Sequence, residues 1–362
     1  MQQIHMASPI IEDDEINSVV DVLKSGNIAQ GKKVKEFEQK YSDYCDVKCS
    51  VAMNSGTAAL HAALSSMGIS KGDEVIVPAF SFIATASAVS MCGATPVFAD
   101  VDPYYFTIDP TNVEKLITNS TKAIIGVHLF GQPFDVDKIL NLGIPVIEDA
   151  AQAHGSMYHG KTVGGFGKAG CFSFYATKNM TTGEGGMITT NDEKYSETIR
   201  RFINHGQSEK YLHTSIGYNY RMTDILASLG ISQLEKLNVF NARRICNANY
   251  YDNHLKAYGL VLPARRDYCK HVFHQYAICI TDDCPTTRNE IMAKLKIDYG
   301  IDTAIHYPIP INKQPIYKNM KSSCLISEKI CNEILSIPVH SSLTALDLNY
   351  ICDSINEVIE NA

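Results

Sequence analysis

The sequence predicts an α/β protein with a large domain on a mainly parallel sheet and a smaller α+β domain at its C-terminal end. Length is one reason, because 362 residues are long for one small core and short for three. Another is the alternation of short β-rich runs with helical patterns from Cys49 to about Asn204, which is typical of βαβ units. This rhythm changes beyond residue 256. We expect the domains to comprise residues 1–240 and 241–362.

The large domain contains six predicted strands with helical patterns between them. The strands are expected at residues 75–77, 96–99, 123–128, 146–148, 171–174 and 186–190. A helix is expected over residues 57–67, and Asp109 followed by Pro110 supplies the cap and first turn of another that runs to Leu116. Residues 222–256 contain no proline and a single glycine, so we expect one long helix that bridges the two domains.

The C-terminal part follows a different order of elements. We expect a strand over residues 272–280, a helix over 288–299, a strand over 303–307, a proline-rich loop over 308–315 and two closing helices. Thr344 with Asp347 three residues later is an acidic form of the capping box, so the last helix should begin there. Together these elements predict a compact α+β domain.

Composition excludes several classes of protein. A formal net charge of −7 argues against nucleic-acid binding, which needs a basic face. The N-terminal segment carries four consecutive acidic residues, at positions 12–15, where a signal peptide needs an apolar run, so we expect a cytoplasmic protein. Residues 75–99 carry no charge, but prolines, serines and a glycine interrupt them, which favours a buried core over a membrane span. None of the 11 cysteines has CxxC spacing, so no metal site is expected.

One apparent nucleotide motif lies in the wrong context. Residues 165–170, Gly-Phe-Gly-Lys-Ala-Gly, match the GxGxxG pattern of dinucleotide-binding folds. That pattern must follow a strand and open a helix, whereas the extended run Cys-Phe-Ser-Phe-Tyr comes next here. A nicotinamide site is therefore not expected.

Three separated pieces form a stronger constellation. Gly56 and Thr57 stand where a strand meets a helix, so backbone N–H groups there could cradle a phosphate or simply start the helix. Asp149 ends a predicted strand, where it could meet a cationic ring nitrogen or cap a helix. Lys178 lies between a strand and a glycine-rich turn, where it could form a Schiff base or be an ordinary exposed lysine. Their order within one parallel-sheet domain favours the functional interpretation.

These pieces belong to a longer series of motifs that resembles a known family, the DegT/DnrJ/EryC1/StrS sugar aminotransferases. The matching motifs span nearly the whole chain and occur at residues 54–57, 72–78, 93–96, 148–152, 173–174, 178–179, 217–222 and 306–308. The family consists of pyridoxal-phosphate (PLP) enzymes of fold type I, which is the aspartate aminotransferase-like fold. The resemblance therefore implies a large, mainly parallel α/β/α domain and a smaller C-terminal α+β domain.

The resemblance also implies site residues. Lys178 would hold PLP as an internal aldimine and shuttle a proton, and Asp149 would keep the pyridine nitrogen protonated. The other implied cofactor-binding residues are Gly56, Thr57 and Ser173 at the phosphate, Phe82 on the ring, Gln152 near the ring hydroxyl, and Asn219 at the phosphate of the neighbouring subunit. The implied substrate-binding residues are Arg221, suited to a carboxylate, and His306 and Tyr307. The loop that follows departs from the family at residues 311–313, Ile-Asn-Lys.

The implied activity is amino transfer in two halves. L-glutamate would leave its nitrogen on the cofactor as pyridoxamine phosphate, and the keto carbon of a nucleotide-linked, 6-deoxy hexose would then receive it. The product would be a nucleotide amino sugar for glycan biosynthesis, and the active unit a homodimer with shared sites. Two alternatives stay open, a PLP- or PMP-dependent sugar dehydratase and a non-catalytic PLP-binding regulatory protein. The presence of Lys178 and Asp149 favours transfer.

Overall fold

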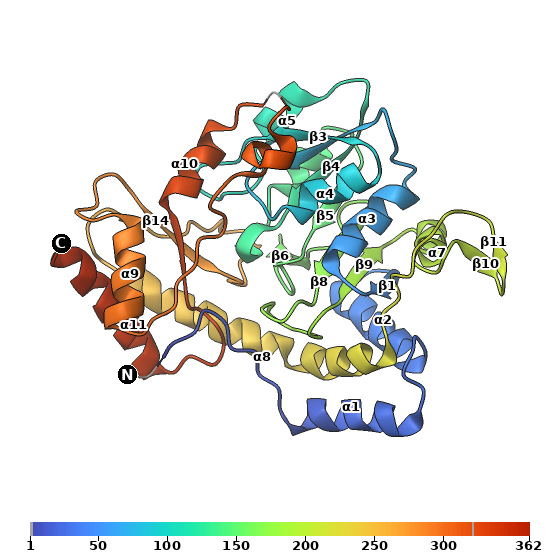
Figure 1. The fold of residues 1–362 in the computed structure, drawn as a ribbon, viewed down its shortest axis with the longest axis horizontal. Helices are drawn as coiled ribbons and strands as arrows, with labels where there is room; N and C mark the ends of the chain where they lie inside the picture. The colour runs from blue at the N-terminus through green and yellow to red at the C-terminus, as the bar shows by residue number, and fades with distance from the viewer. Residues whose placement is uncertain (1–2, 321) are drawn as a thin grey trace.

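A seven-stranded sheet forms the centre of the large domain (Figure 1). The computed structural model of the protein describes residues 3–320 and 322–362. Across the sheet the strands are β1 (Cys49–Met53), β9 (Gly186–Thr190), β8 (Ala169–Ser173), β5 (Val146–Asp149), β4 (Thr121–Val127), β2 (Glu74–Pro78) and β3 (Thr95–Ala99). Strand β9 is antiparallel to both of its neighbours, and the remaining pairs of neighbours are parallel. The predicted mainly parallel sheet is confirmed.

Helices cover both faces of this sheet, which explains why its strands are apolar along almost their whole length. One face packs against α3 (Gly56–Ser66), α4 (Ala84–Met91) and α7 (Glu193–Phe202). The other packs against α2 (Lys32–Cys45), α5 (Pro110–Leu116), α6 (Val136–Leu140) and the first half of α8 (Asp224–His254). Asp109 caps α5, as predicted, and its carboxylate accepts a hydrogen bond from the Thr111 N–H at 2.9 Å. The result is a three-layer α/β/α domain.

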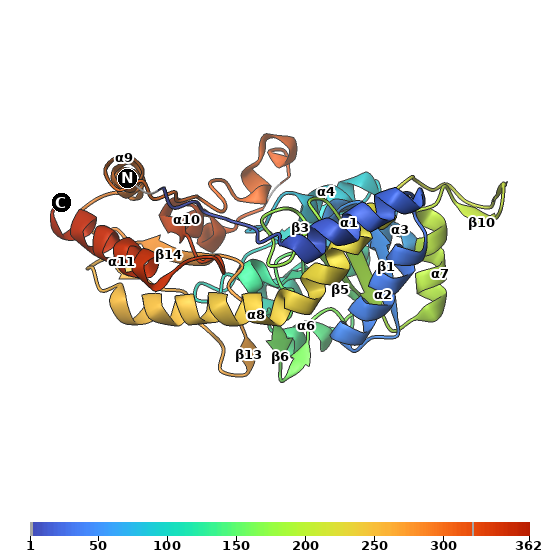
Figure 2. The same ribbon diagram turned by 90° about the horizontal axis from the view of Figure 1, so that it is seen from below.

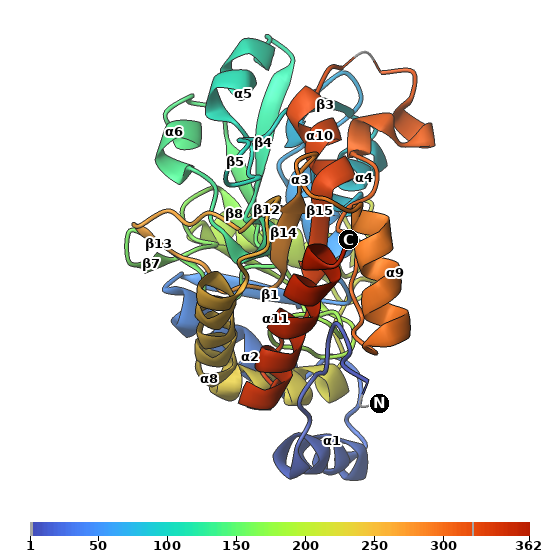
Figure 3. The ribbon, with the colours of Figure 1, turned by 90° about the vertical axis from the view of Figure 1, so that its left-hand side faces the viewer.

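Helix α8 continues from the large domain into the C-terminal part (Figure 1). Its residues Leu234 and Leu237 belong to the core of the large domain, whereas Ala248 and Tyr251 belong to a separate core cluster. That second cluster is formed with β12 (Leu260–Val261), β14 (Tyr276–Ile280), β15 (Ile334–Ile337), α9 (Arg288–Asp298) and α11 (Ala345–Glu360). Helices α9 and α11 pack on the face of this small sheet that carries Ile278 and Leu335, and Figure 3 shows both helices near β14 and β15. The expected boundary at residue 240 falls inside α8, so the exact division of the chain stays a prediction.

Two peripheral segments lie outside this body, α1 as seen in Figure 1 and a hairpin as seen in Figure 2. Helix α1 (Asp13–Ser25) packs on the outside of α8. The hairpin of β10 (Gln207–Glu209) and β11 (Leu212–His213) projects from the edge of the large domain and exposes 83% of Tyr211. A further small sheet combines β13 (Cys269–Lys270), β6 (Met157–Tyr158) and β7 (Lys161–Thr162). No helix within the described residues is both long enough and apolar enough to cross a bilayer.

Three expectations for the C-terminal part are wrong in detail. The strand expected over residues 272–280 is shorter, since β14 begins at Tyr276; Phe273 has a φ of +47°, which is incompatible with an extended strand. A full strand was expected over residues 303–307, but these residues form only one isolated bridge, between Ala304 and Ser336. The chain leaves the edge of the sheet after this bridge, so no longer pairing forms. Strand β15 lies between α10 (Leu325–Glu333) and α11 and is not among the expected strands. The capping box of Thr344 at the start of α11 is confirmed.

Candidate active site

A cavity of about 410 Å³ lies at the carboxyl ends of the parallel strands. Val127, Asp149 and Ser173 are the last residues of β4, β5 and β8, and all three line it. The start of α3 and the segment after β2 complete the wall on the large-domain side. From the C-terminal part, residues 274–275 and 306–307 close the cavity. This is where open α/β sheets bind ligands, and the volume suits a small molecule.

The start of α3 forms a cradle that only a glycine can build. A Cβ on Gly56 would lie 2.7 Å from the Cβ of Ser173, closer than real Cβ atoms approach. The absence of that atom lets the first turn of α3 lie directly against the end of β8. The Ser55 hydroxyl accepts from the Ala58 N–H at 3.1 Å and so fixes the cap. With Thr57 in the first turn, this helix start presents N–H groups and a hydroxyl to an anion.

Asp149 is a buried carboxylate at the floor of the cavity, with 5% of its surface exposed. Its oxygens accept hydrogen bonds from the Thr85 hydroxyl at 2.9 Å and the Ala151 N–H at 3.2 Å. Burial raises the pKa of this carboxyl, and these two bonds and the charge of Lys178 oppose the rise. No α-helix begins at residues 150–156, all of which are described, so the alternative role of Asp149 as a helix cap is not realised. Such a buried carboxylate is suited to a cationic partner.

Lys178 reaches the same cavity from the loop between β8 and β9. Its side chain is half-buried, and among the residues that the structure describes none forms a hydrogen bond or ion pair with Nζ. Burial lowers the pKa of this amine to about 8, although the charge of Asp149 opposes the shift. Lys178 is therefore not an ordinary exposed loop lysine. About a tenth of the amine is therefore neutral at pH 7, and the neutral amine is the state that attacks a carbonyl.

A second layer of polar side chains holds the lysine loop from behind. The Asn179 amide donates to Asn241 Oδ1 at 2.8 Å and to the Val272 carbonyl at 3.1 Å. His154 bridges the Tyr41 hydroxyl and the Ser173 carbonyl, both at 2.8 Å. Burial lowers the pKa of His154 to about 3, so it stays neutral and acts as a fixed hydrogen-bonding strut. These contacts fix the positions of Ser173 and of the residue that follows Lys178.

Gln152 and Tyr307 form a hydrogen-bonded pair on another wall. The Phe130 N–H donates to Gln152 Oε1 at 2.7 Å, which fixes the orientation of the amide. Gln152 Nε2 then donates to the Tyr307 hydroxyl at 3.0 Å. Since that oxygen already accepts, its own proton can be donated to another acceptor in the cavity. Burial raises the pKa of Tyr307, so the hydroxyl keeps this proton.

The predicted site residues do not all lie in the cavity of one chain. Phe82 is at its mouth, 53% exposed, with its ring 6.0 Å from that of Tyr307. His306 also lines the cavity, and its Nδ1 lies 3.0 Å from the Ser336 hydroxyl. Asn219 is exposed outside the cavity, and Arg221 Nη1 donates to Asn204 Oδ1 at 2.6 Å.

Several residues in and around the cavity were not predicted from the sequence. They are Thr85, which binds Asp149, and the lining residues Ser81, Tyr175, Thr177, Glu184, His274 and Gln275. Thr85 has a local signal, since it lies one turn after Ser81 at the start of α4, and the two hydroxyls are 3.0 Å apart. His274 and Gln275 have no such local signal, because they reach the cavity only through the break in the extended chain just before β14.

The glycine-rich run that mimics a nucleotide motif has a structural role. It leads into β8, which begins at Ala169 within the run, as expected from the extended aromatic run that follows. The N–H groups of Gly164, Phe166 and Gly167 all donate to the buried carboxylate of Glu148, at 2.7 to 2.8 Å. His128 Nε2 lies 3.1 Å from the same carboxylate. This loop therefore binds an internal anion and fixes the strand that carries Asp149.

Comparison with known proteins gives consistent matches over nearly the whole chain. The sequence model of the DegT/DnrJ/EryC1/StrS aminotransferase family matches residues 9–356. GDP-perosamine synthase of Caulobacter vibrioides is 38% identical, with 99% of this chain and 99% of that protein covered. A pleiotropic regulatory protein of Geobacillus stearothermophilus is 39% identical, with 95% and 94% covered. The structure of Spr1654 from Streptococcus pneumoniae in a PLP form has a TM-score of 0.94 at 31% identity and covers 99% of both chains.

Proposed function

The chain belongs to the DegT/DnrJ/EryC1/StrS aminotransferase family, and we propose that it is a PLP-dependent enzyme that transfers an amino group from L-glutamate to a nucleotide-linked keto sugar. One observation carries the proposal. Lys178, partly neutral near pH 7, shares a cavity with a buried aspartate and the glycine-built start of a helix. That set of groups is what attachment of an aldehyde cofactor requires.

The residues present fit the three chemical features of PLP. The first turn of α3, with Gly56, Thr57 and Ser173, suits its phosphate. Asp149, buried and bonded to Thr85, suits a protonated pyridine nitrogen. Lys178 suits the aldehyde carbon. The relation to Spr1654, whose structure is a PLP form, supports the same cofactor.

Four side chains of this chain have distinct roles in the proposed reaction. When bound, PLP supplies an electron sink for the carbon that carries the transferred nitrogen. Lys178 Nζ would hold the cofactor, and once displaced by the amine of the donor it would carry the proton from the donor carbon to the cofactor carbon that keeps the nitrogen. Asp149 holds the proton on the ring nitrogen, and its burial strengthens that contact. Gln152 and Tyr307 offer N–H and O–H groups that orient the ring and the substrate oxygens.

We further propose a homodimer whose sites are completed by the second copy. The support is the position of Asn219 and Arg221, which this chain keeps outside its own cavity. In a dimer Asn219 would reach the cofactor phosphate of the neighbouring subunit, and Arg221 would hold a substrate carboxylate. His306 and Tyr307 would contact the sugar from within the same chain. A cytoplasmic location is part of the proposal, supported by free cysteines throughout the described chain.

The acceptor that we propose is a GDP-, UDP- or dTDP-linked 6-deoxy hexose with a keto group, as the precursor of a glycan amino sugar. Similarity to GDP-perosamine synthase supports this class. The dehydratase alternative is disfavoured because Lys178 is present and lies in the cavity. A regulatory role without turnover is kept as a second candidate, since a relative at 39% identity carries a regulatory name.

The decisive experiment follows nitrogen through the protein. Purified protein with PLP should show a visible absorbance band that L-glutamate bleaches, with one 2-oxoglutarate released per site. In the reverse direction, GDP-perosamine and 2-oxoglutarate should give glutamate. Lys178→Ala should do neither, and Lys161→Ala, an exposed lysine, is the matched control. A stable visible band with no bleaching by glutamate would favour the regulatory candidate.

A further inference from the structure

The loop that carries Lys178 rests on α8 at two points. One is the bond from Asn179, the residue after the lysine, to Asn241 at 2.8 Å. The other is the buried Thr181 N–H, which donates to Gln233 Oε1 at 3.3 Å. Thr181 also closes the loop on itself, because its hydroxyl donates to the Phe174 carbonyl at 3.0 Å and accepts from the Gly183 N–H at 2.8 Å. The position of Thr181 therefore sets the path of the loop on both sides of the lysine.

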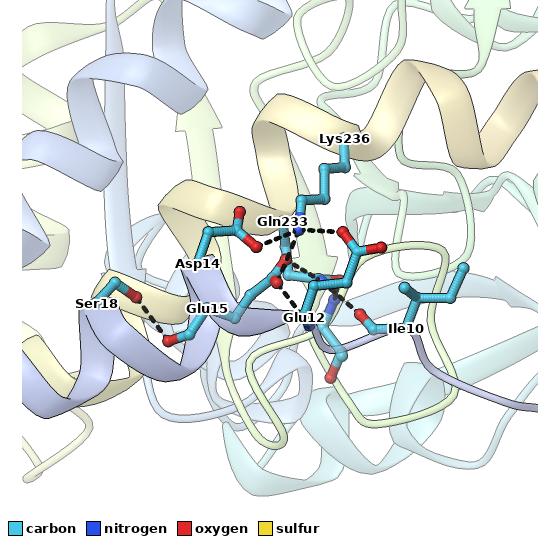
Figure 4. A network of polar contacts seen from close by, with 8 residues as sticks. Ile10, Glu12, Asp14, Glu15, Ser18, Gln233 and Lys236 are labelled. Atoms are coloured by element: carbon cyan, nitrogen blue, oxygen red, sulfur yellow. Dashed lines mark hydrogen bonds and ion pairs between the residues drawn. The ribbon is translucent and has the colours of Figure 1, made fainter.

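The N-terminal segment determines which way the Gln233 amide points. Gln233 Nε2 donates to the Ile10 carbonyl and to Glu15 Oε1, both at 2.9 Å (Figure 4). An amide nitrogen only donates, so two acceptors on the α1 side turn Nε2 toward them. The opposite edge of the amide, Oε1, is thereby left facing Thr181. Without these acceptors, rotation of the amide by half a turn would present N–H groups to another N–H group.

Glu15 is itself rigidly held. It is fully buried, and its Oε2 accepts from the Glu12 N–H at 2.9 Å and from Lys236 Nζ at 2.8 Å. Lys236 also binds Glu12 at 2.8 Å and Asp14 at 2.6 Å, as Figure 4 shows. The ammonium group thus occupies the centre of this acidic cluster, which leaves no room there for a metal ion. Although burial opposes it, hydrogen bonds to the three carboxylates raise the pKa of Lys236, so the charge persists.

The attachment of α1 combines these polar contacts with a narrow apolar stripe, the buried Val22 and the half-buried Val19 and Val20. Glu15 and Val22 are the buried residues of α1, and Leu23 and Ile16 are about half exposed. Loss of the contacts to Gln233 and Lys236 would thus loosen the helix and free the amide.

We propose that Gln233 is a positioning residue for Lys178, held in its working orientation by Glu15 and the Ile10 carbonyl of the N-terminal segment. Through it, docking of α1 on α8 is coupled to the geometry of the lysine loop. The inference deepens the proposed function, since it assigns to the N-terminal segment a part in the same site. If the buried Thr181 N–H loses its acceptor, it can regain a hydrogen bond only if the loop moves toward water, and Lys178 would move with the loop.

The test uses Gln233→Leu, Glu15→Ala and the double variant of the full chain. The first readout is the pH midpoint of Lys178 acetylation in cofactor-free protein, measured by mass spectrometry. The second is the rate of PLP release from the loaded enzyme. Lys40→Met, which breaks the exposed ion pair between α2 and Glu235 of α8, is the control, and thermal unfolding is recorded for every variant.

The expected result is a midpoint moved up by about one pH unit and PLP release accelerated on the order of tenfold in both single variants, as loss of one buried hydrogen bond implies. The double variant should add nothing to Gln233→Leu, because Glu15 acts through that residue. Variants that lose thermal stability but keep the wild-type midpoint would overturn the inference, as would additive effects. Shifted midpoints in a protein that takes up no PLP would support the positioning role while refuting the proposed function.

Discussion

The amine of Lys178 should titrate far below the range of an exposed lysine. Burial lowers its pKa from 10.5 to about 8. At pH 7 a group with a pKa of 8 is about 10% neutral, and one with a pKa of 10.5 is about 0.03% neutral, which is roughly a 300-fold difference. The difference predicts that Lys178 is the fastest-reacting lysine toward a trace amount of an acylating reagent at neutral pH.

Competitive labelling measures this directly. Cofactor-free protein is treated with trace acetic anhydride from pH 6 to 11, and the labelled peptides are quantified against the exposed Lys161. Asp149→Asn removes the charge that raises the Lys178 pKa, so its midpoint should lie below that of the wild type. A wild-type midpoint near 10.5 would refute the desolvation argument. A higher midpoint in Asp149→Asn would refute the assigned interaction.

The same shift has a consequence for stability. The folded-state pKa of Lys178 lies below the unfolded-state value, so between about pH 8 and 10.5 the unfolded chain binds more protons. The free energy of unfolding of the cofactor-free protein should therefore rise with pH across that window, by at most roughly 3 kcal/mol from this group. Below pH 8 the full cost of the buried charge is present. Lys178→Met should accordingly be more stable than the wild type at pH 7, and the two should converge above pH 10.5 in urea titrations.

Three substitutions probe the rest of the site. Gly56→Ala places a methyl group 2.7 Å from the Cβ of Ser173, so we expect PLP to bind at least about tenfold more weakly and the free energy of unfolding to fall by about 1–3 kcal/mol. PLP titration and urea unfolding measure these effects, and an unchanged PLP affinity would contradict the role of the helix start as a phosphate cradle. Tyr307→Phe removes the hydroxyl that accepts from Gln152, and we expect kcat to fall about tenfold with little change in melting temperature. An unaltered kcat would show that Tyr307 has no part in the reaction. Glu148→Gln replaces the buried carboxylate that accepts from three backbone N–H groups, and the free energy of unfolding in urea should fall by about 3 kcal/mol. A fall of less than about 1 kcal/mol would show that the glycine-rich loop keeps its conformation without this carboxylate.

Local sequence was sufficient for features whose physics is local. Asp109 and Thr344 cap the helices that they were predicted to cap, because a cap depends on hydrogen bonds to N–H groups two or three residues away. The alternation of strands and helices predicted the mainly parallel sheet for the same reason. The order of Asp149, Ser173 and Lys178 placed all three at one sheet edge, since parallel strands end on the same side.

Tertiary structure decided everything that depends on contacts between distant segments. The pKa of Lys178 depends on how much water the closed cavity excludes, which no local pattern encodes. Thr85, at the start of α4, meets Asp149 at the end of β5, although β4 lies between β5 and the strand that precedes α4. The strand expected over residues 303–307 does not form, and Tyr307 contacts Gln152 in the cavity wall. The orientation of Gln233 likewise depends on a helix more than 200 positions earlier in the chain. The sequence by itself therefore determined which chemical groups this protein has and at which sheet edge they lie. Packing decided their protonation and their partners, because the environment of a buried group is the sum of all the segments around it.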